Sequence, residues 1–339
     1  MKKTAKIVAF FISATLVFNS PAVFTASAQE KEKTVTLGGQ PFGVKFYNDG
    51  VMVIELEEFF SNDHYVCPAK DAGLKVGDVI KKINDTSVKT NEDVQSATFG
   101  SGGKPIKFTI TRDGKELVKT VIPQKNMVGI YLLGAWVRDS CAGIGTVTYY
   151  DPDNDYFAAL GHGICDSDTS ELMPLGSAEV VTADINSVTK SVDGKAGSLN
   201  GYFTDKTIGK LTKNTECGVF GTAEDSAFDQ GIQLEIAENG ELQPGKAEIY
   251  TTVDGDKAEC FDAEITDILN FDDDSNENFV IKITDEKLIE RCGGIVQGMS
   301  GSPIVQNGKL AGAVTHVFLN DPDEGYGVTA QNMVSNYKS

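Results

Sequence analysis

GGIVQGMSGSPIV, residues 293–305, contains four glycines within its first nine positions, and Ser300 lies between the last two of them. So many glycines are unfavourable in an ordered segment, because glycine loses more conformational entropy on folding than any other residue. They are expected where another backbone must come very close or where a positive φ is required. The apolar residues Ile304 and Val305 predict that a strand follows directly. The pattern therefore predicts a tightly folded turn that presents Ser300 just ahead of a strand.

Ser300 is a candidate nucleophile. A serine hydroxyl needs a base to remove its proton and backbone N–H groups to stabilise the oxyanion that develops. A Gly-x-Ser turn can supply such N–H groups from Gly298 and Ser300, and the segment is similar to the G-D-S-G-G-P turn of chymotrypsin-like proteases. The alternative is a tight turn whose serine has no chemical role.

The chain has three histidines, so the candidate bases are few. His64 belongs to an N-terminal module and is most simply a surface residue. His162 lies in YFAALGHGICD, where a strand ends in small residues, and it precedes Ser300 as the histidine of a chymotrypsin-like fold does. The alternative for His162 is a core or metal-binding histidine. His316, in AGAVTHVF, is expected with Thr315 to line the substrate wall beside the scissile bond.

A third residue must hold the imidazole in the right tautomer. The candidates are carboxylates in three segments, and spacing does not choose among them: Asp285 in IKITDEKL, Asp166 just after the histidine, and Asp225 or Asp229 in EDSAFDQG.

Residues 36–123 predict one small module. VMVIEL (51–56) is a strand, PAKDAGLKVGDVIKKIND (68–85) contains a short helix, a turn and a strand, and Thr90 begins a capped helix. Residues 106–122 form a hairpin that turns at Asp113-Gly114. The pattern resembles the PDZ domain of bacterial proteases, which binds extended peptides by adding a strand to a sheet edge. No carboxylate-binding loop is recognised before Val51, so an internal clamp is an equal alternative.

Residues 128–339 are rich in short β-like segments separated by turn signals, which predicts a sandwich or barrel. With the Ser300 turn and the PDZ-like module, the sequence predicts a mainly β chain: a PDZ domain followed by a chymotrypsin-like double β-barrel domain.

The net charge of −19 argues against a nucleic-acid partner, because phosphate contacts need clustered Lys and Arg. No two of the six cysteines have C-x-x-C spacing, and Asp151, Asp153 and Asp155 lack the Gly and Glu of a calcium loop. We therefore expect no metal and no cofactor.

The N-terminus predicts export. Lys2, Lys3 and Lys6 precede an apolar stretch from Ile7 to Phe18, and Ala26-Ser27-Ala28 matches a cleavage site, so residues 1–28 are a signal peptide or a retained membrane anchor. Export permits disulfides, but spacing does not give their connectivity.

Three stretches resemble the SpoIVB family of PDZ-containing sporulation serine peptidases: VRDSCAGIGTVTYYDP (137–152), ALGHGICDSDT (159–169) and residues 293–328. The likeness extends over residues 36–335. It implies an exported or membrane-associated serine endopeptidase that cleaves itself and then a membrane-bound regulatory protein during spore formation, in the intermembrane space of the developing spore. The family's histidine and serine fall on His162 and Ser300, and its aspartate falls on Asp285.

The function expected from these features is proteolysis of a protein or peptide substrate, with the PDZ domain binding a peptide or the chain itself. One alternative is a binding protein whose protease-like domain docks a partner without cutting it. Another is a related extracellular protease that has no part in sporulation.

Overall fold

The computed structural model describes residues 33–224, 231–272 and 274–338. The expected signal segment, residues 1–28, and the candidates Asp225 and Asp229 lie outside the described residues. Within the described part, none of the helices is long and apolar enough to cross a membrane. The chain is built mainly from antiparallel strands, and its separate hydrophobic cores belong to two barrels and one smaller unit.

The first barrel is a ring of six antiparallel strands in which each strand pairs with the next and the last returns to the first. Its interior is filled by fully buried aromatic side chains such as Phe42, Phe46 and Phe157. In order around the ring the strands are β2 (Pro41–Leu56), β11 (Ala135–Asp151), β12 (Tyr156–Ala159), β15 (Gly218–Ala223), β14 (Ser198–Thr215) and β13 (Leu175–Thr189).

The second barrel follows in the sequence and is also closed. Its strands, in ring order, are β17 (Gly245–Thr251), β18 (Glu259–Ile268), β19 (Phe279–Ile283), β22 (Asp321–Thr329), β21 (Lys309–Phe318) and β20 (Pro303–Gln306). Helix α3 (Glu286–Cys292) connects β19 to the glycine-rich turn, and Gly293 ends it in the left-handed region with φ of 70°. The predicted mainly β fold with two barrels is therefore confirmed.

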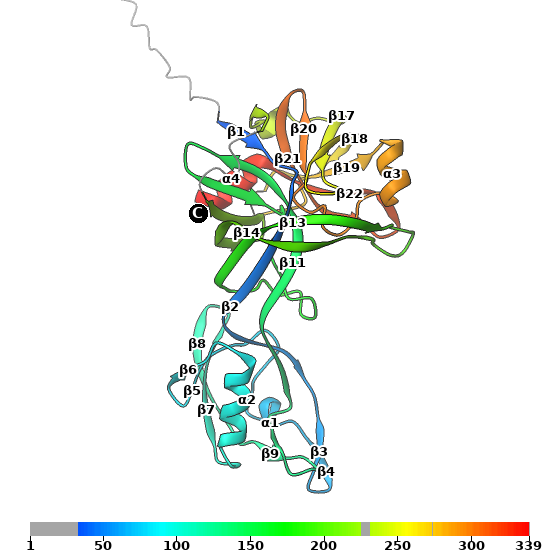
Figure 1. Cartoon of the computed structure of the whole chain (residues 1–339). Helices are drawn as coiled ribbons and strands as arrows, with labels where there is room; N and C mark the ends of the chain where they lie inside the picture. The colour runs from blue at the N-terminus through cyan, green and yellow to red at the C-terminus, as the bar shows by residue number, and fades with distance from the viewer. Residues whose placement is uncertain (1–32, 225–230, 273, 339) are drawn as a thin grey trace, which may run out of the picture. The chain divides into compact units, whose positions relative to one another are not determined.

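Short elements cover the first barrel at the side near the chain ends (Figure 1). Strand β1 (Thr34–Leu37) pairs with β11 on one edge and with β16 (Gln233–Glu235) on the other. The C-terminal helix α4 (Ala330–Lys338) stacks Tyr337 on Tyr156 with ring centres 3.6 Å apart. A 3-10 turn, η1 (Asn239–Glu241), precedes β17.

The PDZ unit lies between β2 and β11 in the sequence. Its helix α2 (Asn91–Gly100) begins at Thr90, whose side chain forms the predicted capping box with Asp93. The predicted hairpin turns at Asp113 and Gly114, both with positive φ. The remaining elements are β3 (Phe59–Ser61), β4 (His64–Val66), α1 (Pro68–Asp71), β5 (Val79–Ile83), β6 (Thr86–Ser87), β7 (Ile106–Arg112), β8 (Lys115–Val121), β9 (Gln124–Lys125) and β10 (Tyr131–Leu132).

Two long strands, β2 and β11, belong to both the PDZ unit and the first barrel. The first part of β2 carries Phe42, Val44 and Phe46 into the core of the first barrel, whereas Val51 and Val53 of the same strand pack in the PDZ core. Strand β11 pairs along β2 over this whole length (Figure 1). The PDZ unit is therefore inserted between β2 and β11 of the first barrel.

Candidate active site

The turn around Ser300 packs closely against the first barrel. Gly298 and Gly301 have φ of 100° and 93°, in the region that favours glycine. A Cβ on Gly301 would lie 2.1 Å from the carbonyl oxygen of Thr146 and 2.4 Å from the nitrogen of Leu160. The groups that approach the serine turn are thus the backbones of β11 and of the residue after β12, which explains the glycine content of the segment.

Two backbone N–H groups are left free at this turn. The amides of Gly301 and Ser302 donate to Val314 and Met299, at 2.8 Å each. Among the described residues, by contrast, the N–H groups of Gly298 and Ser300 have no hydrogen-bond acceptor. These are the two groups that the sequence predicted for an oxyanion hole, and an unpaired pair of donors beside a serine is the arrangement such a hole requires.

His162 follows β12 through two residues with positive φ, Leu160 at 67° and Gly161 at 70°. Its Nδ1 lies 2.8 Å from the carbonyl oxygen of Gly163. A carbonyl oxygen only accepts, so Nδ1 carries the proton and Nε2 keeps the lone pair of a base. Burial of the ring lowers the pKa of His162 to about 4, and the neighbouring His316 adds to the effect. A carboxylate beside the ring would have the opposite effect, because it favours the charged imidazolium.

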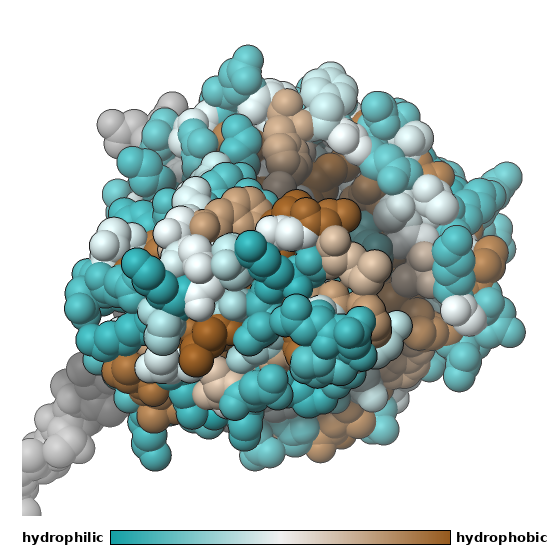
Figure 2. All heavy atoms as spheres, turned by 90° about the horizontal axis from the view of Figure 1, so that it is seen from below, coloured by the Kyte–Doolittle hydropathy of each residue, from teal (hydrophilic) through white to brown (hydrophobic). Residues whose placement is uncertain are grey.

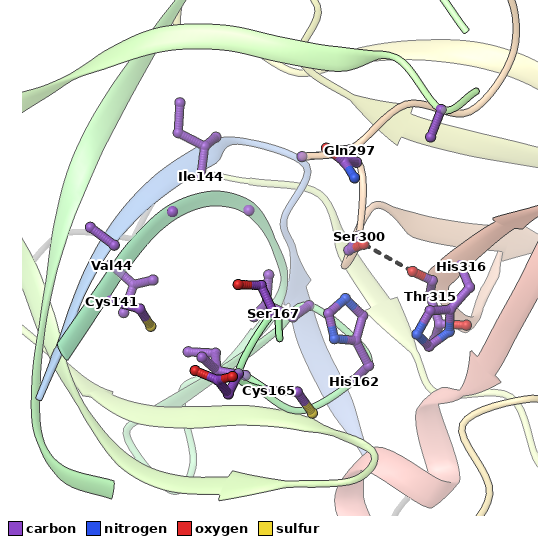
Figure 3. A pocket seen from close by; sticks show the side chains of 18 of the residues that line it. Val44, Cys141, Ile144, His162, Cys165, Ser167, Gln297, Ser300, Thr315 and His316 are labelled. Atoms are coloured by element: carbon purple, nitrogen blue, oxygen red, sulfur yellow. Dashed lines mark hydrogen bonds between the residues drawn. The ribbon is translucent and has the colours of Figure 1, made fainter. Parts of the chain in front are cut away.

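Ser300 and His162 line the same cavity, whose volume is about 720 Å³. Figure 3 shows both side chains pointing into it, together with His316 from β21. The rings of His162 and His316 are 4.9 Å apart between centres. The Ser300 hydroxyl donates to the backbone oxygen of Thr315 at 2.9 Å, so it must rotate away from that oxygen before it can give its proton to His162. Thr315 and His316, which the sequence proposed for a substrate wall, also line this cavity.

Asp285 does not meet His162 in this structure. It is the N-cap of α3, and its Oδ1 accepts hydrogen bonds from the backbone amides of Lys287 and Leu288 at 2.9 and 3.1 Å. It is not among the residues that line the cavity, and no described contact joins it to the histidine. A carboxylate at a helix N-terminus satisfies amides that would otherwise be unpaired, which accounts for this residue without a catalytic role.

We therefore expect Asp285→Ala to act on stability more than on catalysis. Loss of an N-cap lowers the free energy of unfolding by about 1 kcal/mol, and kcat should change by less than about tenfold, far below the effect of replacing a triad aspartate. Thr90→Ala, which removes the cap of α2, is the matched control for chemical denaturation and peptidase assays. A loss of about 10²- to 10⁴-fold in kcat for Asp285→Asn, with the fold intact, would restore the orienting role.

The other carboxylate near the histidine, Asp166, has a fully buried side chain that pairs with Arg138. Burial opposes its ionisation, but backbone amides and Arg138 outweigh this and hold its pKa below the usual value. His64 lies in the β3–β4 hairpin, away from the cavity. Sequence reasoning did not assign Arg138 or Cys141 to the site, although both line the cavity. In the described part of the chain, no three His, Cys, Asp or Glu side chains are placed to hold a metal ion.

A second concave site lies in the PDZ unit. A groove of about 350 Å³ separates α2 from residues 131–137, and Val94, Thr98 and Phe99 of α2 face Leu133 and Val137 across it. Along residues 135–138, β11 pairs with β2 on one edge, and no described strand pairs with the other. Phe99 and Trp136 are about half exposed, and Figure 2 shows apolar patches among polar side chains on one face of the molecule.

Comparison with known proteins places these features in a family. A family model for the SpoIVB peptidase S55 matches residues 129–334, and a PDZ domain model matches residues 43–122. A probable protease, eep, of Enterococcus faecalis is 37% identical over 67 residues, which are 20% of this chain and 16% of that protein. A serine protease Do-like HtrA of Lactococcus lactis subsp. cremoris is 46% identical over 55 residues, 16% of this chain and 14% of the relative. The chain therefore spans only a small part of the length of these relatives.

Two solved structures resemble this chain at lower sequence identity. The PDZ domain of an SdrC-like protein from Listeria monocytogenes is 21% identical, with a TM-score of 0.22, and covers 26% of this chain and 87% of its own. The active form of the Rv3671c protease from M. tuberculosis is 13% identical, with a TM-score of 0.34, and covers 58% of this chain and 74% of its own.

Proposed function

Because the chain belongs to the SpoIVB peptidase S55 family, we propose that it is an exported serine endopeptidase that cleaves a protein substrate, and also itself, with Ser300 as the nucleophile. One observation carries the proposal: Ser300 and His162 point into one cavity beside the unpaired N–H groups of Gly298 and Ser300. A nucleophile, a base and two oxyanion donors are the groups that acyl transfer requires.

In the proposed reaction, the Ser300 hydroxyl leaves the carbonyl of Thr315 and attacks the scissile peptide carbonyl while Nε2 of His162 takes its proton. The N–H groups of Gly298 and Ser300 stabilise the oxyanion, and His162 then returns the proton to the leaving amine. The backbone oxygen of Gly163, which accepts from Nδ1, fixes the tautomer. The pKa of about 4 keeps His162 neutral at physiological pH, ready to act as the base.

The family resemblance supports a role in sporulation signalling, with a membrane-bound regulatory protein as the substrate and the space outside the cytoplasmic membrane as the place of action. In a spore-forming host that lacks the chain, the wild-type protein should restore spore formation and the Ser300→Ala protein should not. Restoration by both would favour a role independent of proteolysis.

The chemical test is labelling with a serine-reactive fluorophosphonate. The chain beginning at Gln29 should label at Ser300 and should shorten with time at its N-terminus, whereas the Ser300→Ala chain should do neither. Cutting is expected before Lys33, because Thr34–Leu37 is a strand paired on both edges and Val35 is fully buried. Equal trimming of both chains would point to a contaminating protease, and absence of labelling would favour a binding protein that does not cut.

We also propose that the PDZ groove binds an extended peptide as an added strand on the free edge of residues 135–138, with apolar side chains directed at Val94 and Phe99. This site explains why no peptide-binding loop could be found before Val51: the strand that borders the groove comes after the PDZ helices in the sequence. Phe99→Asp, at a half-exposed residue of the groove, should weaken cleavage of a protein substrate while sparing that of a small ester. Val118→Asp, a change of an exposed residue of β8 outside the groove, is the control. Equal effects on both substrates would exclude peptide capture.

A further inference from the structure

The segment that carries His162 is held at both ends by side chains from other strands. At its base, Asn214 of β14 binds the amide and the carbonyl of Ile164, at 2.8 and 2.9 Å. At its tip, the guanidinium of Arg138 on β11 donates to Asp166, to Ser167 at 3.2 Å and to Asp168 at 2.6 Å. Arg138 is thus bound to three consecutive residues of the segment.

Asp166 organises this tip from within. Its Oδ1 accepts the backbone amides of Asp168 and Thr169, both at 3.0 Å, and its Oδ2 accepts from Arg138. The Asp166 side chain is fully buried, whereas that of Arg138 is 27% exposed. A buried carboxylate is tolerated only when it is paired and hydrogen-bonded, so removal of Arg138 leaves Asp166 either to take up a proton or to move toward water, and both change the tip of the segment.

Arg138 also occupies a particular place along its strand. It lies where β11 passes from pairing beside the PDZ groove to the stretch that lines the active-site cavity, residues 140–145. Its backbone oxygen accepts from Nδ2 of Asn48 on β2, at 3.1 Å, which fixes the strand at this point. The guanidinium therefore connects a strand of fixed position to the segment of the histidine, four residues from His162.

We propose that Arg138, through Asp166, is a positioning residue that sets the place of His162 in the cavity. The proposal rests on the proposed function, in which His162 is the base. Both terminal nitrogens of Arg138 donate to the segment, whereas Ser300 and His316 reach the cavity from the second barrel. The titratable and nucleophilic groups that line the cavity with His162 are His316 from β21, Ser300 from its turn, Cys165 and Asp166 from the segment of His162, and Cys141 and Arg138 from β11.

The chain supplies a matched control. In the PDZ unit, Arg112 donates to Asp78 at 2.6 and 2.8 Å, and the Asp78 side chain is also fully buried. Arg112→Gln therefore removes the same kind of ion pair from a buried carboxylate, in a place that does not line the active-site cavity. Any general loss of stability should be shared by the two variants, whereas an effect on His162 should not.

The test compares Arg138→Gln, Arg138→Lys and Arg112→Gln in the full chain. For each, the rate constant of fluorophosphonate labelling at Ser300 is measured against pH, kcat and KM are measured for a small uncharged ester, and the imidazole of His162 is titrated by NMR. We expect Arg138→Gln to lower the labelling rate and kcat by about 10- to 100-fold, since small misplacements of a catalytic group have effects of this size. KM should change little. Arg138→Lys keeps the charge but not the planar guanidinium with its several donors, so it should recover part of the loss.

The pH readout separates positioning from simple destabilisation. In the wild type the titration of His162 should lie near 4, and in Arg138→Gln it should move toward about 6.5 as water reaches the ring. Activity requires the neutral ring, so the acid limb of the rate profile should move to higher pH by the same amount. Arg112→Gln should lower the melting temperature and leave both the titration and the profile in place.

Two results would overturn the inference. One is a His162 titration and labelling profile that are the same in Arg138→Gln and Arg112→Gln. The other is a change confined to the KM of the ester, which would make Arg138 a substrate contact. If Arg138→Gln does not fold, Asp168→Asn weakens the same contact at an exposed partner and should shift the titration in the same direction, and no shift would count against the proposal. A wild-type chain that does not label would overturn the proposed function, but the NMR titration would still test whether Arg138 controls His162.

Discussion

Ser300→Ala and His162→Ala should each abolish proteolysis while leaving the fold intact. Removal of a catalytic serine or histidine costs on the order of 10⁴ to 10⁶ in kcat, because the residual rate comes only from the oxyanion hole and from binding. The two effects should not add, since each residue is useless without the other. Ser300 is only partly buried, and its hydroxyl makes one hydrogen bond, so its truncation should change the melting temperature little.

His316→Ala is the control for this pair of variants. His316 lies beside His162 but, unlike His162, it is exposed, on β21. Kinetics with a small ester and labelling at Ser300 should show a modest change for His316→Ala and loss of activity for His162→Ala. If instead the His316→Ala protein were inactive and the His162→Ala protein active, His316 would be the base.

Ser300 and His162, which the sequence singled out and which line one cavity, both stand in unusual local patterns. Ser300 stands in a glycine-rich turn that only close backbone approach explains, and His162 follows a strand that ends in small residues. That these two residues act together was inferred from the resemblance to a known family, because 138 residues separate them in the sequence.

Asp285 could not be assigned in this way. An aspartate between a strand and a short helix is equally suited to capping that helix and to orienting a histidine, and one-dimensional spacing does not separate the two uses. The structure engages its carboxylate with the amides of Lys287 and Leu288. Arg138 could not be assigned to the site because its partner, Asp166, is 28 residues away in the sequence. Nothing in the local pattern around either residue indicates that they form a pair.

The sequence could not show that one strand contributes to two hydrophobic cores. Residues 36–48 and 51–56 are parts of β2 or precede it, but they pack in different cores. A period-2 pattern of apolar residues does not change where one core ends and the next begins. Deleting residues 36–123 would therefore remove Phe42 and Phe46 from the barrel, and it would not isolate the contribution of the PDZ unit.

The second large effect is expected at the glycine that allows the two barrels to meet. In Gly301→Ala, the new Cβ would lie 2.1 Å from the oxygen of Thr146, a backbone atom that cannot move aside as a flexible side chain would. The residue would also hold φ near 93°, where an L side chain is strained. Together these costs lower the free energy of unfolding by about 2–5 kcal/mol.

Catalysis should suffer more than stability, because the clash acts on the turn that carries the oxyanion donors. The hydroxyls of Thr146 and Thr148 on β11 bind the carbonyls of Gly298 and Gly301, both at 2.8 Å, so any shift at residue 301 moves the donors relative to Ser300. Gly308→Ala is the control: φ is 78°, but no atom lies within 4 Å of the added Cβ. Chemical denaturation should show a loss of about 1–2 kcal/mol for Gly308→Ala, with labelling at Ser300 unchanged. If Gly301→Ala labelled at the rate of Gly308→Ala, the close approach of β11 would not be what holds the nucleophile in place.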